Sequence, residues 1–292
     1  MPTRVKRMAN GEPWTVRDLR DLVDPVVVAA FGGWNDAGSA ATGAVEHLEE
    51  AYGAEPVFAL DPDDFYDVQV NRPRVHLAAD GQRQIVWPTT ELKISSLPDG
   101  RDLVLVLGLE PNLRWRQFAT LLASALSSAN VKRVHLLGSL LADTPHTRPI
   151  PVSTSTGDRQ LMTKLGLAPS TYEGPTGIVG VLSDTLTRAG MQVLMLWSAI
   201  PHYVSHPSCP KATLALLTAL EELLGVDLDR GELPELARAW ERGVDELSRE
   251  DSEVAEYVRA LEESRDAADL PEASGDAIAR EFERYLRRRD PG

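Results

Sequence analysis

The sequence predicts a three-layer α/β fold, in which a largely parallel sheet lies between two layers of helices and precedes a small all-helical unit. Over the first three quarters of the chain, apolar strand-like runs alternate with helix-like stretches, which is the order typical of α/β proteins. Several of these runs are apolar throughout, which indicates strands buried on both faces. Beyond Gly231 the apolar residues follow helical spacing only.

The predicted strands are short apolar runs, and most of the predicted helices lie between them. The strands are expected over residues 26–31, 56–60, 84–88, 103–109, 131–137, 177–182 and 192–200. The helices are expected over residues 39–52, 114–129, 158–165, 182–189 and 210–224. Residues 68–77 contain Pro73, which has no N–H to donate to a sheet, so we expect an edge or loop segment there.

Three amphipathic helices are expected after Gly231, because apolar residues recur there at steps of three and four. Their stripes are Leu233, Leu236, Ala237, Trp240, Val244 and Leu247, then Val254, Tyr257, Val258 and Leu261, then Ile278, Phe282, Tyr285 and Leu286. We expect the stripes to pack on one another or on the α/β unit. The alternative is that part of a stripe binds a partner.

The charge of the chain changes at the same place as the pattern. Residues 225–292 hold 20 acidic residues, 11 Arg and no Lys, so they carry −9 of the net charge of −14. This shift in composition marks a boundary. We therefore expect an α/β domain at residues 1–228 and an acidic helical subdomain at residues 229–292.

The composition also excludes several classes of protein. A net charge of −14 repels phosphate backbones, which argues against nucleic-acid binding. No apolar run approaches the roughly 18 residues that a membrane span needs, and the basic N-terminus lacks the apolar region of a secretory signal. Cys209 is the only cysteine, so no intramolecular disulfide can form. We expect a cytoplasmic protein.

The first candidate binding segment follows the first predicted strand. Gly33 and Gly38 permit a tight turn close to a ligand. Asn35 or Asp36 can cap the next helix, whose first N–H groups can hold an anion. The simpler interpretation is a capped strand-to-helix turn without a ligand. The glycine spacing is that of neither a Walker A loop nor a dinucleotide-binding loop.

Two more polar segments follow predicted strands and should emerge at the same edge of a parallel sheet. Glu110 and Arg114 could bind a polar ligand, although an ion pair between them is the commoner outcome. The stretch 138–156 is long and polar for a connection, and His146 with Ser153 would suit an anionic or hydroxylated ligand. Its prolines could equally stiffen a surface loop.

The last two candidate segments are residues 172–177 and 201–210. Glu173 and Thr176 lie among turn residues, so a plain turn is the alternative. His202, together with His206 and Cys209, suggests a metal site only weakly, because prolines break the helix that would align the histidines. We expect no metal and no cofactor, and the sequence contains no nucleophile elbow.

Together, these segments resemble the PAC2 family, which is named for a proteasome assembly chaperone. The resemblance covers about residues 20–225, and the helical tail is similar to that of actinobacterial members. The string from Gly33 to Gly38 is the most specific of the matching elements. The others are Gly108–Pro111 with Arg114-Trp115, Tyr172–Gly177, and Pro201-His202-Tyr203 before a helix.

The resemblance implies an α/β/α domain of the phosphorylase/hydrolase-like fold, with no established reaction in bacteria. It favours a non-enzymatic binding or assembly factor that forms a homo-oligomer, with a trimer as the first estimate, and proteasome subunits as candidate partners. The alternative is a small-molecule binder or an enzyme of the nucleoside phosphorylase or hydrolase type. Its pocket would lie where the strands end.

Overall fold

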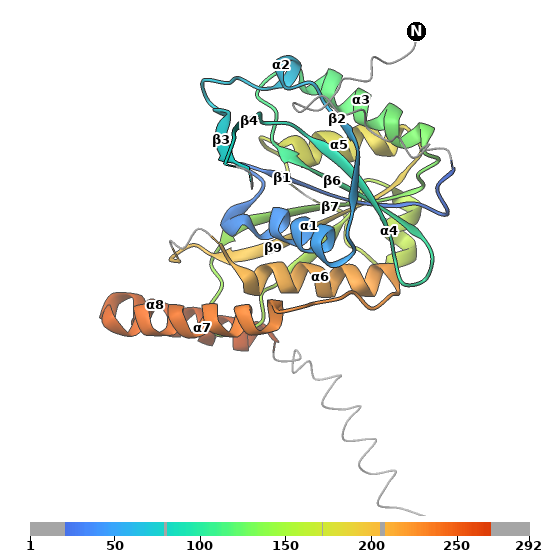
Figure 1. Cartoon of the computed structure of the whole chain (residues 1–292). Helices are drawn as coiled ribbons and strands as arrows, with labels where there is room; N and C mark the ends of the chain where they lie inside the picture. Colours follow the sequence, from blue (N-terminus) through green and yellow to red (C-terminus); the bar gives the residue numbers. More distant parts are fainter. Residues whose placement is uncertain (1–20, 79–80, 171, 205–207, 270–292) are drawn as a thin grey trace, which may run out of the picture.

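The computed structural model describes residues 21–78, 81–170, 172–204 and 208–269. Its centre is a mixed seven-stranded sheet in the order β2-β5-β6-β1-β7-β9-β8 (Figure 1). The four inner strands β6, β1, β7 and β9 run parallel, and the outer strands are antiparallel to their neighbours. The strands are β1 Val26–Gly32, β2 Glu55–Ala59, β5 Glu91–Ser96, β6 Asp102–Leu109, β7 Arg133–Ala142, β8 Val152–Ser155 and β9 Gln192–Pro201.

Helices cover both faces of this sheet, as the sequence predicts (Figure 1). One core cluster joins α1 and α6 to one face, and a second joins α3 and α5 to the other. Because both faces are covered, β1 is buried along Val26–Phe31, which explains its unbroken apolar run. The helices are α1 Ala40–Ala51, α2 Pro62–Phe65, α3 Trp115–Ser128, α4 Arg159–Leu165, α5 Ile178–Arg188 and α6 Pro210–Leu224, with a short 3₁₀ helix at Ala37–Ser39.

The strand predicted at residues 177–182 is wrong, because this segment is the first half of α5. Its apolar run suits either structure when read alone. The buried side chains Ile178, Val179, Leu182 and Leu186 follow helical spacing and continue into the predicted helix at 182–189. The strands β5 and β8 were not predicted, since both are short and partly polar.

A separate two-stranded hairpin stands apart from the central sheet. It pairs β3, Arg74–Leu77, with β4, Arg83–Val86, and every residue of both strands is exposed. The predicted strand at residues 84–88 thus belongs to this hairpin. The stretch 68–77, predicted as an edge or loop segment, supplies the other strand. Figure 1 shows the hairpin on the side of the molecule toward which β1 and β9 run.

Two of the three predicted C-terminal helices lie within the described residues. They are α7, Leu233–Glu250, and α8, Ser252–Asp269. The apolar side of α7 contributes Leu233, Trp240 and Val244 to the core around α6. The third helix, around Ile278, lies outside the described residues, and the division at residue 228 stays a prediction. Within the described part of the chain, no helix is long and apolar enough to cross a membrane.

Candidate functional site

Three of the predicted segments meet at the carboxyl edge of the inner strands. The Asn35 side-chain amide donates a hydrogen bond of 2.7 Å to Oε1 of Glu110. The same oxygen accepts a 2.8 Å bond from the backbone N–H of Ile178, the first residue of α5. A Cβ added to Gly177 would lie only 2.1 Å from Oδ1 of Asn35. The turn after β1, the turn after β6 and the start of α5 thus form one junction.

The parallel pairing of β1 and β6 brings the first two segments together. Gly32 is the register partner of Leu109, and the Glu110 N–H donates a 2.8 Å bond to the Gly32 carbonyl. Gly33 then adopts φ +123°, a conformation that side chains rarely allow. This turn buries Asn35, which is 1% exposed, and leaves its Oδ1 without a hydrogen-bond partner among the described residues.

Asp36 caps α1 from the same turn. Its Oδ1 accepts bonds from the N–H groups of Ala41 and Thr42 at 2.8 and 3.2 Å. Burial raises the pKa of this carboxyl group, and the hydrogen bonds to Thr42, Ala41 and Ser139 partly offset that rise. The Ser139 hydroxyl lies 3.4 Å from Oδ1, so Asp36 also ties this turn to β7.

Gly38 has a packing role in this turn. It adopts φ +59°, and an added Cβ would lie 3.0 Å from Cβ of Cys209. The Cys209 N–H donates to the Gly38 carbonyl at 2.8 Å, which joins the turn to the start of α6. Burial raises the pKa of the Cys209 thiol to about 11, so this thiol is a poor nucleophile and a poor metal ligand.

Carboxylates of the chain itself occupy the starts of α1 and α5. A helix N-terminus favours negative charge because its first N–H groups are unpaired. At α1 this charge comes from Asp36, and at α5 it comes from Glu110, 68 residues away in sequence. A phosphate bound at either place would have to displace a buried or half-buried carboxylate. The junction is therefore built mainly to hold the two turns and two helices together.

The predicted ion pair between Glu110 and Arg114 does not form. Glu110 turns toward Asn35 and α5, whereas Arg114 donates a 2.6 Å bond to Asp64 at the surface. Arg114 precedes α3 with a left-handed φ of 53°. The remaining predicted residues of this group, Ser153, Glu173 and Thr176, are exposed. Thr176 adjoins the junction, and its hydroxyl lies 3.5 Å from the Gly177 carbonyl.

His146 and His202 belong to a second cluster, which the C-terminal helices complete. The buried His146 ring lies between the Tyr203 hydroxyl, 2.7 Å from Nδ1, and Asp245 of α7, 3.1 Å from Nε2. His202 is half exposed, and its Nδ1 lies 3.3 Å from Asp143. Burial raises the pKa of Tyr203 to about 12, so its hydroxyl stays protonated. This cluster joins the β7–β8 loop to α7.

Sequence reasoning missed the partners of His146. Tyr203 and Asp245 lie 57 and 99 residues away in the chain, and no local spacing links them to the histidine. Tyr203 follows His202 in the segment 201–210. An aromatic residue next to a histidine is the only feature of the sequence that points to this cluster. His206, the other histidine of the proposed metal set, lies outside the described residues. Within those residues, no group of three metal-binding side chains occurs.

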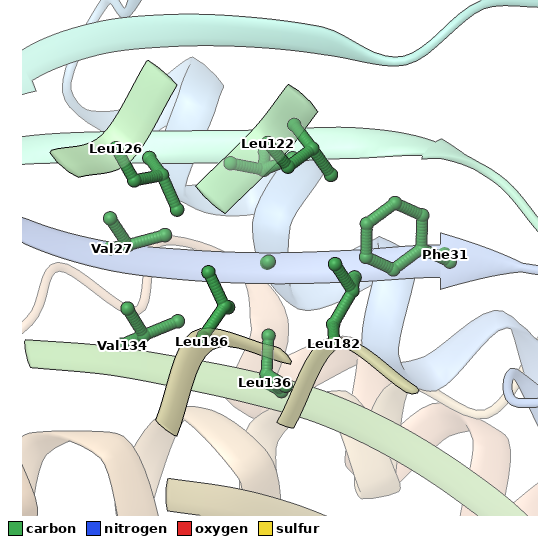
Figure 2. A pocket seen from close by; sticks show the side chains of 10 residues that line it. Val27, Phe31, Leu122, Leu126, Val134, Leu136, Leu182 and Leu186 are labelled. Atoms are coloured by element: carbon green, nitrogen blue, oxygen red, sulfur yellow. The ribbon is translucent and has the colours of Figure 1, made fainter. Parts of the chain in front are cut away.

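Two hollows of the structure are lined by residues of α3 and α5. Figure 2 shows a small cavity between β1, α3 and α5. It is lined by Val27, Phe31, Leu122, Leu182 and other apolar side chains. Its volume is about 10 Å³, and it has no polar lining, so it is a packing gap in the core. A larger open groove of about 710 Å³ runs between α3 and α5, and Thr176 lies at its edge.

The sequence matches the PAC2 family over residues 30–248. This match spans most of the chain and includes every segment of the two clusters. The chain therefore belongs to the PAC2 family. No protein with a curated description matches it.

Solved structures of the family share this fold. A PAC2 family protein from Streptomyces avermitilis is 55% identical, with a TM-score of 0.76, and the match covers 80% of this chain and 100% of that one. The Mycobacterium tuberculosis proteasome-assembly chaperone homologue Rv2125 is 47% identical, with a TM-score of 0.73, and covers 80% and 99%. Rv2714 of M. tuberculosis, described as of unknown function, is 27% identical, with a TM-score of 0.75, and covers 91% and 89%.

The contact between Gly177 and Asn35 provides a test of the junction. We expect Gly177→Ala to lower the free energy of unfolding by about 2 kcal/mol, because the new methyl group overlaps the Asn35 amide. Gly157→Ala is the matched control, since nothing lies within 4 Å of a Cβ at that position. Urea unfolding measures both variants. Equal stability of the two variants would contradict the described contact.

Proposed function

We propose that this protein is a non-enzymatic binding factor with a chaperone-like assembly role, related to the proteasome. The observation that carries the proposal is that the junction uses its carboxylates for folding. Asp36 and Glu110 each accept hydrogen bonds from a helix N-terminus, so neither stands free to act as an acid or base. A PAC2 relative with 47% identity is described as a proteasome-assembly chaperone homologue, which supports the same role.

Exposed apolar side chains at the carboxyl edge support a binding role. Trp34, just after β1, is 64% exposed, and Leu140 and Leu141 near the end of β7 are 45% and 60% exposed. Leu109, the last residue of β6, and Leu113, in the turn after it, are also exposed. Apolar surface gathered at one edge is typical of protein interaction sites. We define the edge surface as Trp34, Leu109, Leu113, Leu140 and Leu141.

The β3–β4 hairpin supports self-association. Val75 is the register partner of Ile85, and Leu77 lies two residues further along the same face. These three side chains are between 52% and 64% exposed. A two-stranded hairpin is at best marginally stable in water without a packing partner. A second copy of the chain would cover this apolar face, and a trimer remains our first estimate of the assembly.

One observation favours the alternative of a small-molecule site. Oδ1 of Asn35 is buried without a hydrogen-bond partner among the described residues, which costs about 1–3 kcal/mol. A ligand that donates a hydrogen bond to this oxygen would remove the free-energy cost of leaving it unpaired. Gly177 lies against the same oxygen and would have to shift to admit the ligand. A thermal-shift screen with nucleosides, phosphate and phosphorylated metabolites distinguishes the two proposals. Stabilisation by a ligand that Asn35→Ala abolishes would favour the alternative.

The hairpin gives a direct test of self-association. We expect Val75→Glu with Ile85→Glu to give a monomer, because both charges enter the apolar face. His76→Glu with Gln84→Glu adds the same charge to the opposite face and should keep the wild-type mass. Light scattering coupled to size-exclusion chromatography measures all three proteins. The same mass for both double variants would contradict the proposed interface.

The edge surface gives a test of partner binding. We expect Trp34→Glu with Leu141→Glu to reduce co-purification of the source organism's 20S proteasome subunits by about tenfold. A few buried anchor residues carry most of the binding energy of an interface, and each substitution replaces such an anchor with a charge. Leu121→Glu with Leu165→Glu changes two exposed leucines on α3 and α4 and is the matched control. No enrichment with the wild-type protein, or equal loss in both variants, would count against the proteasome role.

A further inference from the structure

Helix α7 presents a second apolar stripe, separate from the one that joins the core. Leu236, Ala239, Gly243 and Leu247 follow steps of three and four, so they share one side of the helix. All four are exposed, and Leu236 and Leu247 reach 49% and 66%. We call these four residues the outer stripe. Because Ala239 and Gly243 are small, another helix could approach the backbone closely there.

Neither the core nor α8 covers the outer stripe. The core side of α7 is formed by Leu233, Ala237, Trp240 and Val244, which are nearly fully buried. A further side of α7 carries Glu241 and Asp245, which contact Lys211 and His146. At 100° per residue, the outer stripe lies next to the core side and opposite Glu241 and Asp245.

Acidic side chains border the outer stripe. Glu246 and Glu250 are one turn apart and exposed, beside Gly243 and Leu247. The ion pair that α7 forms within itself, between Arg249 and Asp245, uses neither of them. Within the described part of the chain, no other ion pair reaches either carboxylate. An occupant of the stripe should therefore combine an apolar face with positive charge.

The chain itself contains a segment with that chemistry. Between Ile278 and Arg289 the sequence has five Arg and two Glu, whereas the C-terminal quarter as a whole is acidic. Ile278, Phe282, Tyr285 and Leu286 have the spacing of one helix face. Arg284 and Arg288 are one turn apart, the same spacing as Glu246 and Glu250.

A second copy of α7 fits the outer stripe less well. It would bring another acidic border next to Glu246 and Glu250, and like charges destabilise such a pair. The β3–β4 hairpin and the edge surface, the other exposed apolar surfaces defined above, are already proposed to bind a second copy and a partner protein. The basic segment at residues 278–289 is the occupant that satisfies both the apolar and the charge requirements.

We propose that residues 278–289 bind as an amphipathic helix to the outer stripe of α7 in the same chain. Phe282 and Leu286 would pack near Gly243 and Leu247, with Arg284 and Arg288 beside Glu246 and Glu250. The end of α8, where the described chain stops, lies within reach of the outer stripe. A single residue, Asp251, separates α7 from α8, so α8 returns toward the start of α7, beside which it lies in Figure 1. The eight residues 270–277 can span about 25 Å, enough to cross a helix about 10 Å wide.

Disulfide trapping in the full chain tests this proposal. The only native cysteine, Cys209, is 2% exposed, so introduced cysteines are the reactive ones. We expect Leu247→Cys with Phe282→Cys to crosslink within one chain about tenfold faster than Arg242→Cys with Phe282→Cys, because docking raises the effective concentration. Arg242 lies on the same helix, exposed, and off the outer stripe.

Charge reversal provides the second arm. In the Leu247→Cys, Phe282→Cys protein, Glu246→Arg with Glu250→Arg should slow crosslinking by about threefold or more, and Arg284→Glu with Arg288→Glu should restore it. Equal rates for the two cysteine pairs would overturn the proposal. Crosslinks found only between separate chains, in a mixture of the two single-cysteine proteins, would overturn its assignment to one chain. A reversal without effect, or without rescue, would overturn the charge argument.

Discussion

The hydrogen bonds accepted by the Glu110 carboxylate are the interactions on which the carboxyl edge of the sheet depends. Oε1 of this carboxylate holds both the amide of Asn35, at the end of β1, and the first N–H of α5. Three segments that are distant in sequence therefore share one acceptor. Asp36 acts similarly at α1, and Gly177 leaves the space that the Asn35 side chain fills. Because buried donors without acceptors are costly, removal of this carboxylate should loosen the whole edge.

This arrangement explains why the glycine-rich turn after β1 looks like a ligand cradle in the sequence. Tight turns, helix N-termini and polar side chains are present, but the chain's own carboxylates occupy the starts of α1 and α5. The exposed surfaces for which we propose binding roles are apolar: the edge surface, the hairpin and the outer stripe of α7. The second cluster, around His146, connects the α/β layers to α7 through Tyr203, Asp245 and Lys211. The C-terminal helices are thus joined to the carboxyl edge by polar contacts as well as by the core.

Much of the fold could be predicted from the sequence. Continuous apolar runs identify β1, β6, β7 and β9. A strand that is covered on both faces has apolar side chains on both sides, so apolar and polar residues do not alternate along it. The strand predicted at residues 177–182 is wrong, because a short apolar run fits a strand and a buried helix equally well. The convergence of Asn35, Glu110 and Gly177 was predicted only as a common edge, since strand pairing decides which side chains meet. The partners of His146 come from elements up to 99 residues away, and no local pattern encodes them.

The stability of Glu110 variants tests the central claim most directly. If Glu110 holds the junction together, Glu110→Ala should lower the free energy of unfolding by about 3 kcal/mol, since two buried donors lose their acceptor. Glu110→Gln keeps one oxygen and should lose only about 1 kcal/mol, mainly the interaction of the charge with the start of α5. Unchanged or increased stability in Glu110→Ala would contradict the account, because residues kept for chemistry rather than folding are often replaced without loss of stability.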